Sequence, residues 1–119
     1  MGVKGLISGS VLLLCTGCSI QGGKVEPEYE FTLFKHYALT SCIAQGYSSG
    51  DVYTDSVAAL NGYRERSSLP LEAFQQLNLS IQRWLQKPYR DSSGEKTEIA
   101  ACADFVESNE LKELFKRYK

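Results

Sequence analysis

The feature that most constrains this chain is a helical repeat of apolar side chains, which recurs from Phe31 to Tyr118. Its strongest example is the stretch PLEAFQQLNLSIQRWL at 70–85, where apolar residues stand three or four positions apart. Pro70 precedes this stripe, where a helix tolerates proline, and Pro88 follows its end. No segment alternates apolar and polar residues as a strand does. The pattern predicts an all-α fold, a compact bundle of about five helices.

Four further stripes have the same spacing, and their residues are expected to face the core. They are Phe31, Phe34, Ala38, Ser41 and Cys42; then Val52, Ser56, Ala59, Leu60 and Tyr63; then Ile99, Cys102, Ala103 and Val106; and last Leu111, Leu114, Phe115 and Tyr118. Gly46 is expected to end the first helix, and Ser108 to cap the last. With 119 residues, 43% of them hydrophobic, the chain can support one domain with a modest core.

The first 17 residues have the pattern of a secretory signal peptide. Lys4 supplies the positive end, residues 5–14 are mostly apolar, and small residues precede Cys18. The apolar stretch is about half as long as a bilayer-spanning helix, which excludes a membrane-spanning anchor. We therefore expect a signal peptide at 1–17, a flexible tether at 18–29 and a helical domain at 30–119.

Cys18 has two open interpretations. The residues before it resemble the lipobox of bacterial lipoproteins, in which the cysteine is acylated after cleavage, although Cys15 stands where the lipobox usually has leucine. The alternative is cleavage nearby and a soluble periplasmic product. A zinc or redox site at Cys15 and Cys18 is disfavoured because no second ligand pair follows. We expect lipidation at Cys18 and a location in the periplasm, with a lipid anchor to the outer membrane as one form.

Charge and residue inventory exclude several function classes. The net charge is −1 and the basic residues are dispersed, so nucleic acid is not an expected partner. The sole histidine, His36, lies about 240° around its predicted helix from Cys42, too far for a nucleophile and base. The carboxylates form no pair suited to acid and base chemistry. We expect neither an enzyme nor a metal or cofactor site.

The remaining two cysteines, Cys42 and Cys102, lie on predicted core faces of the first and fourth helices. In an oxidising compartment such a pair is better explained by a disulfide than by two free thiols. Closing a loop of about 60 residues contributes about 4 kcal/mol in the chain-entropy model. The bond would also hold the helix that follows the longest polar interruption of the bundle.

That interruption is KPYRDSSGEK at 87–96, a stretch rich in turn residues. It is either an ordinary solvated connection or a recognition loop presented by two rigid helices. Tyrosine and arginine are common interface anchors, which favours recognition. The candidate binding residues are Tyr89, Arg90, Asp91, Ser92, Ser93, Gly94 and Glu95.

The segments FKHYALTSCIAQGY at 34–47, PLEAFQQL at 70–77, KPY at 87–89 and CADFVESNELKELFKRY at 102–118 point to a family. Together they resemble the immunity proteins that neutralise type VI secretion amidase effectors. The resemblance implies a periplasmic helical homodimer without a cofactor. It also implies a protruding loop, here 87–96, that enters the cleft of a cysteine amidase acting on peptidoglycan. A small structural or adaptor lipoprotein without an inhibitory role is the alternative.

Overall fold

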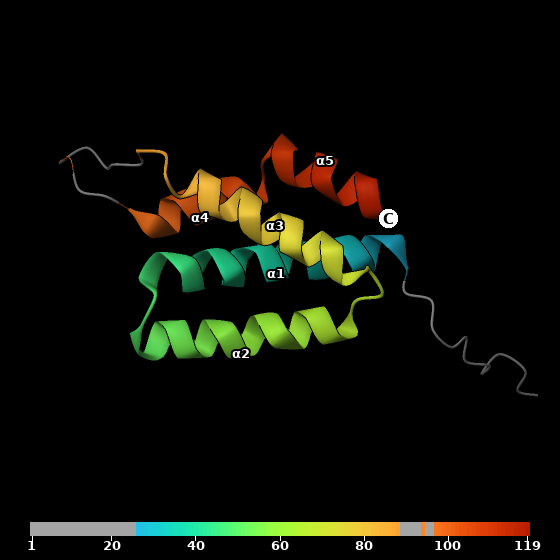
Figure 1. Ribbon diagram of the computed structural model, residues 1–119, viewed down its shortest axis with the longest axis horizontal. Helices are drawn as coiled ribbons and strands as arrows, with labels where there is room; N and C mark the ends of the chain where they lie inside the picture. The colour runs from blue at the N-terminus through green and yellow to red at the C-terminus, as the bar shows by residue number, and fades with distance from the viewer. Residues whose placement is uncertain (1–25, 89–93, 95–96) are drawn as a thin grey trace, which may run out of the picture.

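The computed structural model describes residues 26–88, 94 and 97–119, and in them the chain forms five helices (Figure 1). They are α1 (Pro27–Tyr47), α2 (Gly50–Arg66), α3 (Leu71–Trp84), α4 (Glu98–Val106) and α5 (Asn109–Tyr118). No strand occurs in the part of the chain that the structure describes. The predicted all-α fold is confirmed. The predicted signal peptide and Cys18 lie outside the described residues.

Helix α1 is the centre of the bundle. It contacts each of the other four helices, while α2 packs mainly against α1 alone (Figure 1). Helices α3, α4 and α5 pack against α1 and against one another. The end where α1 begins is also the end where α5 finishes, and α3 ends and α4 begins at the opposite end (Figure 1).

The core is built mostly from the stripes that the sequence predicts. Its largest fully buried side chains are Phe34, Phe74, Leu77, Ile81, Phe105, Leu111 and Leu114, together with Cys42 and Cys102. The aromatic rings among them meet at tilted angles, as between Phe34 and Phe74, whose ring centroids lie 5.8 Å apart. Such offset contacts are the favoured arrangement for aromatic pairs.

Four apolar residues that the helical pattern places on core faces are instead exposed. Val52, Leu71 and Ile99 have exposed fractions of 48%, 56% and 52%, and each lies in the first turn of its helix. The fourth is Ala103 of α4, whereas Phe105, which the pattern does not place on a core face, is fully buried. The core face of α4 is therefore rotated from the predicted one.

The helix ends follow local chemistry. Ser108 caps α5 as predicted, because its side-chain oxygen accepts a hydrogen bond from the Leu111 amide at 3.2 Å. Helix α1 ends at Tyr47, one residue beyond the expected Gly46, and Ser48 there adopts a left-handed conformation with φ 57°. At its other end α1 begins at Pro27, so residues 27–29 are helical where a tether was expected. Proline is favoured at this first position because the N–H group that it lacks would have no intrahelical acceptor there.

Candidate functional site

The predicted recognition loop connects the end of α3 with the start of α4. Among its candidate binding residues the structure describes Gly94, while Tyr89–Ser93 and Glu95 lie outside the described residues. Gly94 is exposed and has φ +92°, a left-handed conformation that favours glycine over other residues. The described part of the site is therefore Gly94 and the two helix ends that carry the loop.

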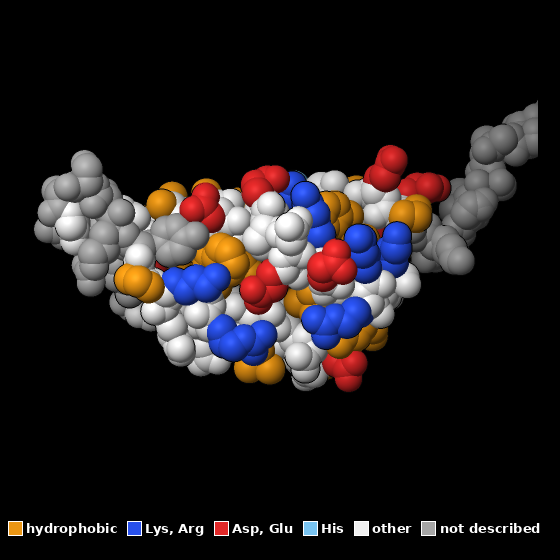
Figure 2. Space-filling model, turned by 90° about the horizontal axis from the view of Figure 1, so that it is seen from above, with side chains coloured by type: hydrophobic (Ala, Val, Ile, Leu, Met, Phe, Trp, Pro, Cys, Tyr) orange, Lys and Arg blue, Asp and Glu red, His pale blue; other side chains and the backbone are white. Residues whose placement is uncertain are grey.

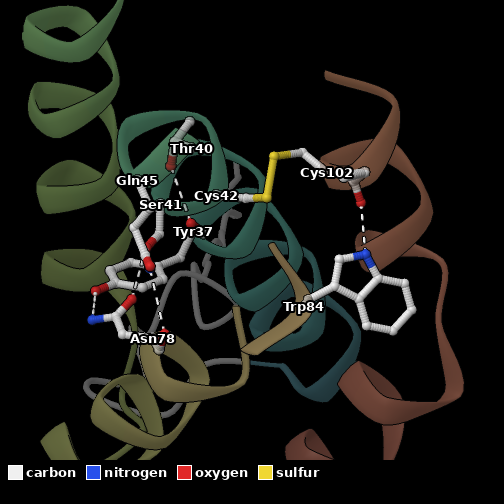
Figure 3. Close-up of a disulfide and its surroundings, with 9 residues drawn as sticks. Tyr37, Thr40, Ser41, Cys42, Gln45, Asn78, Trp84 and Cys102 are labelled. Atoms are coloured by element: carbon white, nitrogen blue, oxygen red, sulfur yellow. Dashed lines mark hydrogen bonds between the residues drawn. A yellow bond between two sulfur atoms is a disulfide. The ribbon is translucent and has the colours of Figure 1, made fainter. Parts of the chain in front are cut away.

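Trp84 closes the base of the loop on the α3 side. Its indole N–H donates a hydrogen bond to the Ala101 carbonyl of α4 at 2.9 Å (Figure 3). The ring packs edge-on against Phe105, with centroids 5.3 Å apart. The Lys87 ammonium lies over the ring, 3.6 Å from its centroid, in a cation–π contact. The Trp84 indole thus connects the last turn of α3 to Lys87 at the start of the loop and to Ala101 and Phe105 of α4.

The Cys42–Cys102 disulfide fixes α4 to α1 (Figure 3). The two Cα atoms lie 5.6 Å apart, and both cysteines are fully buried. The predicted disulfide is confirmed. It lies one residue from the carbonyl that Trp84 binds, so the covalent bond and the hydrogen bond hold the same turn of α4.

A third contact joins α1 and α4 at this end of the bundle. A Cβ atom placed on Gly46 would lie 3.1 Å from Glu98 Oε2 and 3.2 Å from Glu98 Cβ. The absence of a side chain at Gly46 therefore allows the last turn of α1 to approach the first turn of α4. Together with Trp84 and the disulfide, this contact gives the loop a rigid base.

Beside this base a polar network joins α1 to α3 (Figure 3). Asn78 is its centre: its amide donates to the Tyr37 hydroxyl at 2.9 Å, and its carbonyl oxygen accepts from Ser41 at 2.7 Å. The Gln45 amide donates to the Ser41 hydroxyl at 3.3 Å and to the Asn78 backbone carbonyl at 3.4 Å. The sequence pattern places Ser41 and Asn78 on core stripes, but periodicity cannot show that the two residues pair.

The network forms part of the floor of an open groove of about 750 Å³ between α2 and α3. One wall is apolar and the other is mostly amide-bearing: Tyr53, Val57 and Leu60 of α2 face Gln75, Gln76, Leu79 and Gln82 of α3. Tyr53 and Leu79 are 39% and 45% exposed. Nothing in the apolar pattern of the sequence predicts this groove, since it depends on α2 lying apart from α3.

Glu30 is a second feature that sequence reasoning misses. This carboxylate is 4% exposed and accepts hydrogen bonds from the Ser67 hydroxyl and from the Ser68 amide and hydroxyl, the latter two at 3.0 Å. It thereby ties the first turn of α1 to the connection between α2 and α3. The sequence signals for this contact are weak: a glutamate next to the apolar stripe of the first helix, and two consecutive serines after the second helix.

The described residues give no support to catalysis by a cysteine. Cys42 and Cys102 are bonded to each other, and His36 is exposed with its ring 5.2 Å from Tyr63. Within residues 26–88, 94 and 97–119, no group of three His, Cys, Asp or Glu side chains could hold a metal ion. No helix in these same ranges is long and apolar enough to cross a membrane.

Comparisons with known proteins agree with this geometry. The family model Tai4, described as type VI secretion system (T6SS) amidase immunity protein, matches residues 32–115. The chain also resembles a solved structure of the effector–immunity system Tae4/Tai4 from Salmonella typhimurium, with 25% sequence identity and a TM-score of 0.69. That match covers 80% of this chain and 96% of the other. No curated protein matched the chain.

Proposed function

Because the chain belongs to the family of type VI secretion system amidase immunity proteins, we propose that it binds and inhibits a peptidoglycan amidase effector in the periplasm. The family match at residues 32–115 is the observation that carries this proposal, since it includes α2, α3 and α4 whole and most of α1 and α5. The chain is an immunity protein and not an enzyme.

We propose further that the segment at 87–96 enters the active-site cleft of the effector. The support comes from its base, where Trp84, the disulfide and the close approach of Gly46 to Glu98 fix both flanking helices. A segment presented by such a base loses less entropy on binding than one on a mobile support. Tyr89 and Arg90 would anchor it, and the polar residues Asp91 to Ser93 would satisfy buried groups of the cleft.

A homodimer is the proposed assembly. The support is the groove between α2 and α3, where Tyr53 and Leu79 expose apolar surface on opposite walls. Apolar surface gathered in one groove is a feature of protein–protein interaction sites. Light scattering of the purified protein tests this point, and a monomer at working concentration would exclude it.

The proposed function is tested by co-purification and by inhibition. The protein, exported to the periplasm of its host, should retain the effector encoded beside it and should stop that effector from cleaving peptidoglycan. An effector that neither binds nor loses activity would reject the proposal. Inhibition by a stoichiometric complex requires no catalytic step, only an affinity high enough to keep the delivered effector bound.

A further inference from the structure

A second hollow lies at the end of the bundle opposite the loop, where α1 begins and α5 ends. Its volume is about 350 Å³. The rings of Phe31 and Phe115 form its floor, with centroids 4.8 Å apart, and Pro27 adds to the apolar surface. Phe115 is only 7% exposed, so Pro27 and Phe31 supply most of the apolar surface that a ligand group could contact.

The rim of this hollow is basic. Lys112, Lys116 and Lys119 line it, against a single carboxylate, Glu28. The charge of Lys116 is partly neutralised, because it forms an exposed ion pair with Glu113 at 3.2 Å. Lys112 and Lys119 against Glu28 therefore leave a small excess of positive charge on the rim, and acidic side chains also lie at this end of the molecule (Figure 2). That combination matches an amphiphile with an anionic head group.

The position of the hollow in the chain favours a membrane phospholipid as this amphiphile. Pro27 is both the first residue of α1 and part of the lining. Cys18, the predicted site of lipid attachment, is nine residues earlier, and an extended chain of that length reaches at most about 30 Å. Acyl chains on Cys18 would therefore keep the hollow close to the membrane surface.

We propose that the hollow docks the domain onto an anionic phospholipid surface. The lysines contact the phosphate groups, and Pro27 and the Phe31 ring lie against the boundary between head groups and acyl chains. Helix α1 has 21 residues and rises about 31 Å, so the loop end of the bundle then points away from the membrane. This last point, that the docked domain presents its recognition loop to an arriving effector, rests on the proposed function.

Lysine footprinting on vesicles tests the docking. The full chain, purified as its host processes it, is acetylated with an amine reagent in the presence of vesicles that contain phosphatidylglycerol or phosphatidylcholine alone. Mass spectrometry then measures labelling at each lysine. Lys112, Lys116 and Lys119 should lose labelling by about fivefold or more on the anionic vesicles only. Lys87, at the opposite end of the bundle, should be labelled equally on both and serves as the internal control.

A matched variant completes the test. Lys112→Ala with Lys119→Ala should abolish the protection of Lys116 on anionic vesicles while leaving the melting temperature unchanged, because both side chains are exposed. Equal labelling on the two vesicle types, or protection by glycerol phosphate without vesicles, would overturn the proposal. The same variant should still inhibit the effector in solution. If the wild-type protein fails to inhibit the effector, the proposed function is rejected, whereas the result on membrane docking is unaffected.

Discussion

The indole nitrogen of Trp84 and the carbonyl oxygen of Ala101 lie 2.9 Å apart, although 17 residues separate them in the chain. This hydrogen bond spans the base of the segment that connects α3 to α4. The Cys42–Cys102 bond holds the next residue of α4. The connection is therefore flanked by turns of α3 and α4 that are tied to each other and to α1 (Figure 3).

Replacing Trp84 with phenylalanine should destabilise the protein by about 1–3 kcal/mol. The smaller ring keeps some packing against Phe105 but loses the hydrogen bond and part of the buried area. Urea unfolding followed by circular dichroism measures the loss. Lys87→Ala is the matched control, because it removes only the exposed cation over the ring and should change stability by less than about 0.5 kcal/mol. Equal effects of the two changes would argue against a structural role for the indole.

Removing the disulfide should cost about 4 kcal/mol in the chain-entropy model, since the bond closes a separation of 60 residues. The Cys42→Ala, Cys102→Ala double variant should show the loss as a large fall in melting temperature. Reduction of the wild-type protein in denaturant, followed by refolding in reductant, should reproduce it. An unchanged melting temperature would mean that packing alone holds α4.

Glu30→Gln should destabilise the domain by about 2–3 kcal/mol. The carboxylate accepts hydrogen bonds only, whereas an amide would point N–H groups at the Ser67 and Ser68 donors. Ser68→Ala, which removes one of these donors, should cost less, about 1 kcal/mol. Glu28→Gln is the exposed control in the same turn. If chemical denaturation finds Glu30→Gln no worse than Glu28→Gln, the buried acid is not a structural anchor.

Tyr118 should make the stability depend on alkaline pH. Partial removal from water, followed by the 3.0 Å hydrogen bond that it donates to Glu72, raises the pKa of Tyr118 above its ordinary value of 10.0. A raised pKa in the folded state means that this contribution is complete below pH 10 and is lost as the pH rises through the folded value. The melting temperature of the wild type should therefore fall more steeply above pH 10 than that of Tyr118→Phe. Parallel curves would contradict the coupling.

The core could be predicted from the sequence because residues such as Phe74, Leu77 and Ile81 repeat at the helical period and are buried at that period. The Ser108 cap was predictable for a similarly local reason. The disulfide was predictable because two cysteines stand on predicted core faces, which left no choice of partner. The Glu30 anchor and the Asn78 network were not predictable, because each joins residues 33 or more positions apart through polar atoms. The exposure of Val52 and Leu71 could not be predicted either, because it depends on where the neighbouring helices end.

The loop itself carries the most specific prediction about the partner. Tyr89→Ala and Arg90→Ala should each weaken binding to the effector by about 2 kcal/mol or more, since interface tyrosines and arginines often dominate affinity. Folding stability should hardly change. Tyr29→Ala and Arg64→Ala are matched controls, because both side chains are exposed and lie in α1 and α2, outside the loop. Isothermal titration calorimetry gives the affinities. Equal losses of affinity in the loop and control variants would mean that the loop is not the main interface, even if the protein still inhibits the effector.

The central claim is inhibition, and the most direct measurement is a titration of effector amidase activity on purified peptidoglycan with increasing amounts of the wild-type protein. Activity should fall linearly and vanish near one immunity chain per active site, and the Tyr89→Ala, Arg90→Ala double variant should require a large excess to do the same. Amidase activity that persists in the presence of excess wild-type protein would contradict it.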